Sequence, residues 1–172
     1  MSPKEKEHKL LRIVGVKMND AVRKEFVAQG HHLTGAMEQS LNASTIGMGN
    51  TVHLIGSVLY YGAIVNDGVP ANKIPYADGK GGGHSAYIQG LIRYAQLRFG
   101  ASGKEAVSIA FAIAKKHKKE GMPTQGSYAF SATGQRTHFF EIVYQVLNGE
   151  IDDMISMGLD DIVEAEFRKT DK

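Results

Sequence analysis

The stretch Leu33–Gly68 constrains the fold most, because it predicts two strands, a tight turn and a short helix in immediate succession. Met37–Met48 and Thr51–Val58 each alternate between two sets of side chains, and a period of two is typical of half-buried strands. The pair Gly49-Asn50 between them tolerates the positive φ of a hairpin turn. We therefore predict an antiparallel hairpin over residues 37–58. Gly56, in the middle of the second strand, predicts a bulge or a close backbone approach.

The hydrophobic period changes after the second strand. Leu59, Ala63 and Ile64 have the spacing of one helix face. Gly68 is a suitable C-terminal cap for this helix, and Pro70 cannot continue it. The prediction is a short helix that follows the hairpin directly and ends at Gly68.

Four further helical segments are predicted from apolar residues at three- and four-residue spacing. They span Glu5–Gln29, Ser85–Phe99, Lys104–Glu120 and Thr137–Lys169. Gly149 is a candidate kink or break in the last segment. The connector 120–135 is rich in turn residues, and the alternation of Tyr128 with Phe130 is compatible with a short strand there.

The hairpin region resembles the tail-component or head–tail joining family of long-tailed bacteriophages, which includes tail-completion and neck proteins. The resemblance rests on a short motif before the hairpin, a second motif in the helix after it, and an aromatic run before the closing helix. The matching residues are Thr34, Gly35, Met37 and Ser40, then Tyr60, Tyr61, Ile64, Val65, Asn66 and Gly68, and later Thr137, His138, Phe139 and Phe140. Family members often carry an acidic residue where Asn66 stands, and Asp67 follows it here.

The resemblance implies a structural protein of a phage or prophage virion that acts by assembly. Its expected partners are further copies of itself, in a ring on the particle, and neighbouring neck, portal-adaptor or tail-tube proteins. Its expected location is the neck or tail of the virion, and the bacterial host cytoplasm before assembly. Such proteins are often monomers in solution, and we expect flexible segments such as Asp78–Gly83 to order on contact with a partner.

The predicted fold class is α+β, in a single domain over residues 1–172. The long N-terminal and C-terminal helices pack with the small antiparallel sheet. The resemblance breaks off between residues 71 and 135, so the glycine-rich loop and the helical pair that follows it form an insertion.

The inserted helical pair, residues 85–120, supports a second function class, a DNA-binding module that resembles a helix–turn–helix. Recognition helices contact bases mainly from their N-terminal part, whereas the positive charge of this second helix lies at its C-terminal end. That end is therefore suited to a partner or to phosphate rather than to base edges. The residues concerned are Lys115, Lys116, Lys118 and Lys119.

Charge is distributed unevenly along the chain. Lys104–Lys119 contains five lysines and one glutamate, a net charge of +4, whereas Glu150–Lys172 contains eight acidic and three basic residues, a net charge of −5. Such segments are usually solvated faces. In a ring they can also meet across a heterologous interface, where complementary charges favour encounter and register. We hypothesise that Lys115–Lys119 of one subunit approaches the acidic helix of a neighbour.

Composition and motifs argue against several other functions. The chain lacks cysteine, which excludes disulfides and thiolate metal sites, and its net charge of +2 is too small to indicate nucleic acid. Its seven histidines show no metal-ligand spacing, no GxSxG motif occurs, and the glycines of 70–83 lack the strand and GK[ST] ending of a phosphate-binding loop. No apolar run reaches the ~20 residues that span a bilayer. We expect no enzyme activity, no cofactor, no metal and no membrane association.

Overall fold

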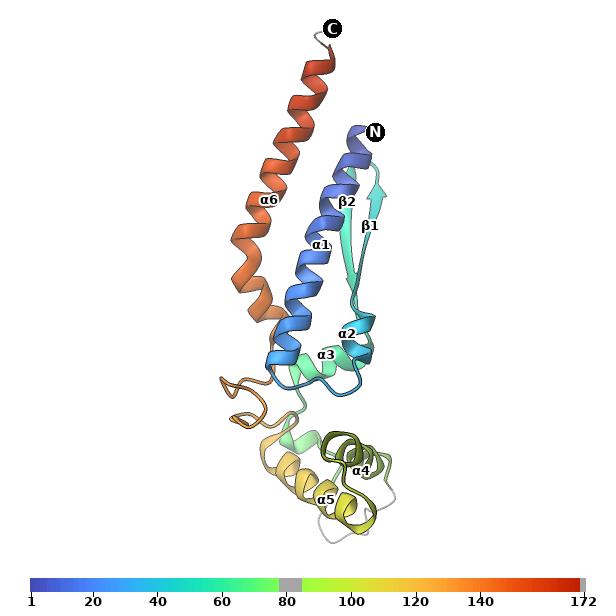
Figure 1. Cartoon of the computed structure of the whole chain (residues 1–172), viewed down its shortest axis with the longest axis vertical. Helices are drawn as coiled ribbons and strands as arrows, with labels where there is room; N and C mark the ends of the chain where they lie inside the picture. The colour runs from blue at the N-terminus through green and yellow to red at the C-terminus, as the bar shows by residue number, and fades with distance from the viewer. Residues whose placement is uncertain (78–84, 171–172) are drawn as a thin grey trace. The chain divides into compact units, whose positions relative to one another are not determined.

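The computed structural model describes residues 1–77 and 85–170, and it confirms the α+β class (Figure 1). The elements in chain order are α1 (Pro3–Ala28), α2 (Ala36–Ser40), β1 (Asn42–Met48), β2 (Thr51–Ser57), α3 (Tyr60–Asp67), the 3-10 turn η1 (Ala71–Lys73), α4 (Ala86–Phe99), α5 (Gly103–Glu120) and α6 (Phe139–Thr170). The predicted flexible segment Asp78–Gly83 lies outside the described residues.

The chain separates into two compact units. The first unit consists of Met1–Val27, Gly35–Gly62 and His138–Lys172, and the second of Ala28–Thr34 and Ala63–Thr137. The inserted segment 71–135 lies wholly in the second unit. The single-domain assignment stays a prediction.

The hairpin forms with the predicted turn, but it is shorter than predicted. Met48 pairs with Thr51, so Gly49-Asn50 is a two-residue turn. Gly49 has a φ of 59° and Asn50 does not have a positive φ, which is typical of a type II′ turn. Residues 37–40, predicted as strand, belong instead to helix α2, because Met37 and Leu41 are both buried at a helical spacing of four.

Gly56 forms no bulge. It faces Ala43 in a register that is unbroken from Asn42–Ser57 to Met48–Thr51. No atom lies within 4 Å of the position that a Cβ on Gly56 would occupy. The prediction of a bulge or a close approach at this residue is therefore wrong.

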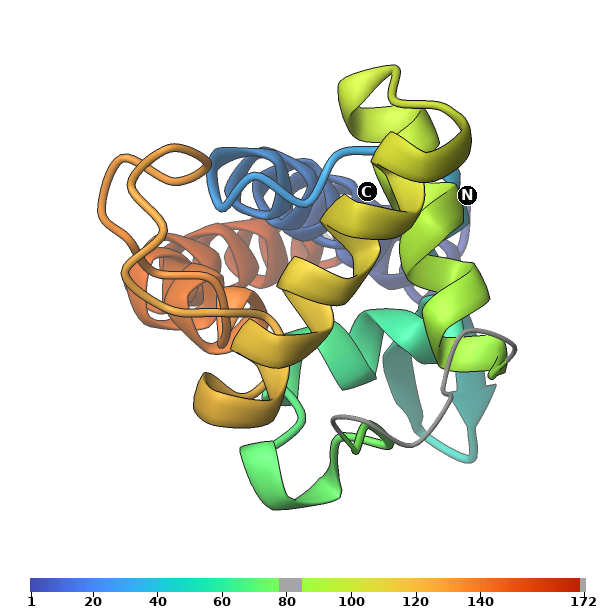
Figure 2. The ribbon, with the colours of Figure 1, turned by 90° about the horizontal axis from the view of Figure 1, so that it is seen from below.

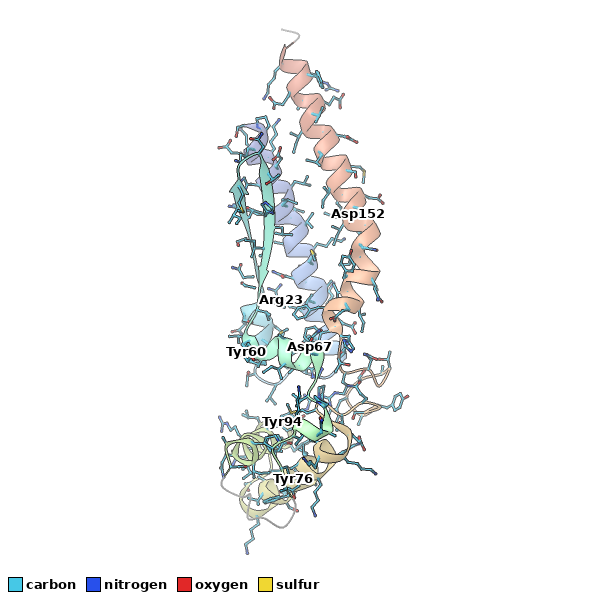
Figure 3. The ribbon with its side chains drawn as sticks, turned by 180° about the vertical axis from the view of Figure 1, so that it is seen from behind. Arg23, Tyr60, Asp67, Tyr76, Tyr94 and Asp152 are labelled. Carbon is cyan, nitrogen blue, oxygen red and sulfur yellow. The ribbon has the colours of Figure 1, made fainter. Side chains whose placement is uncertain are left out.

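Helix α1 packs on the inner face of the hairpin at close range. A Cβ on Gly15 would lie 2.6 Å from the Cβ of Ala43 and 2.9 Å from a methyl group of Leu54. Figures 1 and 3 show the hairpin on one side of α1 and helix α6 on the other. The first unit is thus built around α1, whose buried residues are Val14, Gly15, Val22 and Phe26.

Helix α1 begins with a capping box that the sequence analysis did not use. The backbone N–H of Ser2 donates to the carboxylate of Glu5 at 2.7 Å, and the N–H of Glu5 donates to Oγ of Ser2 at 3.3 Å. These bonds lower the pKa of Glu5. Pro3 occupies the first helical position, which needs no N–H donor.

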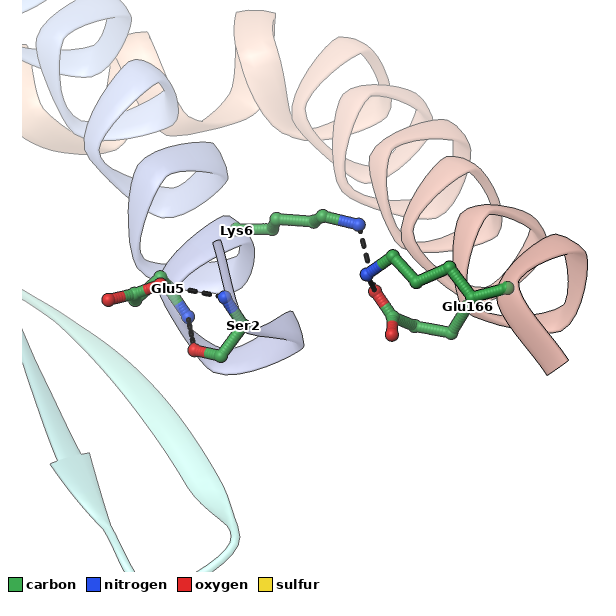
Figure 4. Close-up of polar contacts among 5 residues, drawn as sticks. Ser2, Glu5, Lys6 and Glu166 are labelled. Atoms are coloured by element: carbon green, nitrogen blue, oxygen red, sulfur yellow. Dashed lines mark hydrogen bonds and ion pairs between the residues drawn. The ribbon is translucent and has the colours of Figure 1, made fainter.

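Helix α6 runs without interruption from Phe139 to Thr170, so Gly149 does not divide it. At one end, the rings of Phe26 and Phe139 meet edge to face with centroids 5.3 Å apart. At the other, Nζ of Lys6 lies 2.9 Å from the carboxylate of Glu166 (Figure 4). Contacts at both ends therefore hold α6 along α1.

The second unit contains the predicted pair of helices, α4 and α5, which are joined by a short turn (Figure 2) and contact each other through buried residues of both. The hydroxyl of Ser85 accepts a hydrogen bond from the N–H of Ile88 and caps α4, and Gly100, with a φ of 67°, ends it. Buried alanines of α5 pack against α4 and allow close approach: Ala106, Ala110 and Ala114. Residues 128–130 form turns, so the short strand considered there is absent.

The close approach at Gly15 can be tested with an alanine. Ala is the better helix former, but its methyl group would overlap Ala43 and Leu54. We expect Gly15→Ala to lower the free energy of unfolding by about 1–3 kcal/mol, measured by urea denaturation. The matched control is Gly90→Ala in α4, where no atom lies within 4 Å. It should raise the same quantity by about 0.5–1 kcal/mol. Equal stabilisation by both variants would contradict the packing of α1 on the hairpin.

Candidate functional site

The motif that precedes the hairpin connects the two ends of the hairpin. Gly35 has a φ of 77°, a conformation that favours glycine, and starts α2. Met37 is 1% exposed. The hydroxyl of Ser40 donates to the carbonyl of Met37 at 2.7 Å and accepts from the N–H of Leu59 at 3.1 Å. Ser40 therefore joins the segment entering β1 to the segment leaving β2.

Arg23 of α1 binds the end of α2 through hydrogen bonds. The sequence analysis did not identify this residue. Its guanidinium donates to the carbonyls of Glu38 and Leu41 at 2.9 and 3.1 Å, and it also contacts the carboxylate of Asp20. The carbonyls at the end of a helix lack intrahelical partners. Arg23 satisfies two carbonyls at the end of α2 from a residue far away in sequence, which no local pattern indicates.

The second motif lies along α3. Tyr60 is 82% exposed and Tyr61 42%, and burial, followed by the charge of Glu38, raises the pKa of Tyr61. Asn66 is buried and its side-chain amide donates to the carboxylate of Asp67 at 3.1 Å. Gly68 ends the helix as predicted, with a φ of 75° and an N–H bonded to the carbonyl of Ile64.

The motif residues do not form one cluster in one unit. Gly35, Ser40, Tyr60 and Tyr61 belong to the first unit, whereas Thr34, Asn66 and Gly68 belong to the second. Within the first unit, the bond from Leu59 to Ser40 brings the two motifs together at the start of α3. Of these residues, Gly35, Ser40 and Gly68 have a structural role in the hairpin and its helices.

The first unit exposes apolar side chains on two surfaces. On the outer face of the hairpin, Ile46, Met48 and Ile55 are 41–60% exposed. On α6, Leu159, Val163 and Phe167 follow one another at four-residue spacing and are 41%, 52% and 67% exposed. Helix α1 covers a different stripe of α6, where Leu10 approaches Gly158 and where Ile162 is buried.

The acidic side chains of α6 are partly paired within the unit. Glu150 contacts Lys17, and Glu166 contacts both Lys6 and Lys169. Hydrogen bonds from Lys169 and Lys6 lower the pKa of Glu166. These exposed ion pairs contribute little to stability, so the acidic face remains available to solvent and to a partner.

The four lysines at the C-terminal end of α5, Lys115, Lys116, Lys118 and Lys119, are all exposed. Lys116 pairs with Glu120 at 3.8 Å, and Lys118 donates to the carbonyl of Ile74 at 3.2 Å. Lys115 and Lys118, together with Tyr76 and Ala77, line a shallow depression of about 360 Å³.

The α4–α5 pair has contacts along its whole length. Ala95, Ala101 and Ala106 pack together near the turn, and at the far end the hydroxyl of Tyr87 lies 2.8 Å from Nδ1 of His117. The two helices are therefore packed together from the connecting turn to the far end of the pair. The positive charge of the pair lies at the C-terminal end of α5, where Lys115, Lys116, Lys118 and Lys119 are exposed.

Two histidines of the second unit, the half-buried His31 and the buried His117, are neutral at pH 7. His117 is 9% exposed, and burial, followed by the charge of Arg136, lowers its pKa to about 4. Burial and the charge of Arg136 also lower the pKa of His31 to about 4. A hydrogen bond of 3.0 Å to the carbonyl of Arg136 acts in the opposite direction and raises this pKa. Burial also raises the pKa of Tyr87 to about 12.

Comparisons with family models, with curated proteins and with solved structures found no match to the chain. Within residues 1–77 and 85–170, no three side chains of His, Cys, Asp or Glu gather in a way that could hold a metal ion. In the same part of the chain, no helix combines the length and the apolar character needed to cross a membrane.

The neutral histidines predict a pH dependence of stability. Between pH 6.5 and 4 the unfolded chain binds protons on His31 and His117 that the folded chain excludes, so stability falls as the pH falls through this window. Each histidine contributes a slope of up to about 1.4 kcal/mol per pH unit. We expect His117→Gln to reduce the slope, measured by urea denaturation between pH 5 and 6.5.

The control for this measurement is His53→Gln, on the outer face of the hairpin, where the side chain is exposed. This variant should keep the wild-type slope. A His117→Gln protein with an unchanged slope would show that His117 takes up its proton in the folded state as readily as in the unfolded chain.

Proposed function

We propose that the chain is a structural protein of a phage or prophage virion, which forms a ring at the head–tail connection or completes the tail. It acts by assembly and not by catalysis. Its partners would be further copies of itself and neighbouring neck, portal-adaptor or tail-tube proteins. The proposal rests on the resemblance of the motif residues and on one structural observation, the exposed apolar surface of the first unit.

The apolar stripe on α6 is the main support. Side chains four residues apart are neighbours on a helix surface, so Leu159, Val163 and Phe167 form one continuous strip. Apolar residues scattered singly are normal on a protein surface, but a contiguous strip is typical of an interaction site. Acidic residues flank this strip, which suits a contact with a basic partner surface.

The hairpin offers a second surface of the same kind. Its two strands are the whole sheet in the described part of the chain, so each has an unpaired edge. Natural proteins usually cover or block such edges, because they can pair with another chain. A subunit with unpaired edges and an apolar strip on another element can form the heterologous contacts that close a ring.

A deletion and complementation experiment tests the function. Particles made without this gene should be filled heads lying apart from finished tails, or tails of wrong length, when viewed by electron microscopy. The wild-type gene should restore infectious particles. A Leu159→Ser, Val163→Ser double variant should fail to restore them, because it removes the apolar strip and leaves the folded subunit intact.

The control is Leu97→Ser, which changes an apolar residue of α4 that is 45% exposed and lies in the other unit. It should complement the deletion. Circular dichroism and urea denaturation of each variant would establish that it folds. Normal infectious particles without the gene would overturn the structural role and put DNA binding through the exposed lysines of α5 first.

The charge-based contact between subunits makes a separate prediction. If Lys115–Lys119 meets the acidic helix of a neighbour, Lys116→Glu with Lys119→Glu should abolish incorporation into particles, because both contacts become repulsive. Incorporation is measured by immunoblotting of purified particles. Lys104→Glu, at the other end of α5, carries half the charge change and should be incorporated normally. Normal incorporation of the double variant at low salt would exclude this contact.

A further inference from the structure

Arg136 carries a positive charge that no acidic side chain of the described residues neutralises. It is 9% exposed, and its Nε donates to the carbonyl of Gln29 at 3.2 Å. Its two Nη atoms form no hydrogen bond with the described residues. They are also not fully buried. The Nη atoms therefore reach solvent, although the rest of the side chain does not.

Arg98 brings a second cation to the same place. The guanidinium carbons of Arg98 and Arg136 lie 5.3 and 5.2 Å from the centroid of the Phe130 ring. Arg98 donates one N–H to the carbonyl of His32 at 2.9 Å. Among residues 1–77 and 85–170, neither arginine belongs to an ion pair. Two guanidinium groups thus share one aromatic ring without a counter-ion among the described residues.

The two histidines whose pKa is lowered by burial and by the charge of Arg136 add no charge at pH 7. His31 and His117 face Arg136 and are neutral at pH 7, and Tyr94 is the further titratable group near it. Burial lowers the pKa of Arg136, the interaction with Tyr94 raises it, and the charge of Arg98 lowers it. Arg136 remains positive at neutral pH because the pKa of an arginine begins far higher. The cluster therefore holds two positive charges.

A buried charge without a partner is costly, and it is usually matched by an opposite charge. Phe130 supplies a cation–π contact to both arginines, but it supplies no charge and no hydrogen-bond acceptor for the Nη atoms. Guanidinium groups bind oxyanions through paired N–H donors. Two of them match the two negative charges and the several oxygens of a phosphate better than the single charge of a carboxylate.

We propose that Arg98 and Arg136, held at Phe130, form a binding site for a phosphate group supplied from outside the chain. The site lies within the second unit and is independent of the assembly role proposed above. Two sources carry this chemistry, free inorganic phosphate and the backbone of a nucleic acid. The sequence analysis did not find it, because residues 98, 130 and 136 show no motif.

Nuclear magnetic resonance of the full chain tests the site with inorganic phosphate at neutral pH. We expect the Nε–H resonances of Arg98 and Arg136 to shift and saturate, and the pKa of His31 and His117 to rise, because a bound anion favours their charged forms. Arg98→Gln should weaken binding at least about tenfold. Arg93→Gln, an exposed arginine on the same helix, removes the same charge and should leave binding unchanged.

The outcomes are distinct. Three results would overturn the site. The resonances could fail to shift saturably with phosphate, or shift equally with chloride at the same ionic strength. Arg93→Gln and Arg98→Gln could also weaken phosphate binding equally. A short oligonucleotide that shifts the same resonances at lower concentration identifies nucleic acid as the source. A shift with inorganic phosphate alone identifies the free ion. The amide spectrum of each variant establishes that it is folded.

Discussion

The first unit depends on the packing of α1 against the inner face of the hairpin. A two-stranded hairpin is at best marginally stable alone, so its apolar face must be covered by another element. The absence of a side chain at Gly15 lets α1 approach Ala43 and Leu54 closely enough to do this. Once α1 is fixed on the hairpin, its opposite side is available to α6. The order hairpin, α1, α6 therefore follows from one close contact.

The second unit uses small residues in the same way and differs in its polar interior. The alanines of α5 let α4 approach, as Gly15 lets α1 approach the hairpin. Beside this apolar packing lie Arg136 and His117, polar groups that are more than nine-tenths buried. The first unit exposes the apolar strip and the acidic side chains of α6, and the second exposes the lysines at the end of α5. This division is compatible with a subunit whose surfaces are completed by other molecules.

Most helices and the hairpin turn could be predicted because local rules govern them. Ser85 and Gly100 bound α4, Gly68 ends α3, and Gly49 forms the turn, each through the conformation or hydrogen bond of its own residue. The prediction of secondary structure was wrong at residues 37–40, where the same residues fit both the period of a strand and that of a helix. Met37 and Leu41 suit an alternating strand and a helix equally, and the burial of both under tertiary contacts decided for α2.

The sequence by itself determined the type and approximate bounds of the elements, because capping, turn conformation and hydrophobic period act between near neighbours. Only the tertiary structure decided which stripe of α6 is covered and which one, with Val163, stays exposed. It also decided that Arg23 would bond the end of α2 and that Arg98 would meet Arg136 at Phe130. These contacts join residues that are distant along the chain, and their geometry depends on how whole elements pack, which no local pattern encodes.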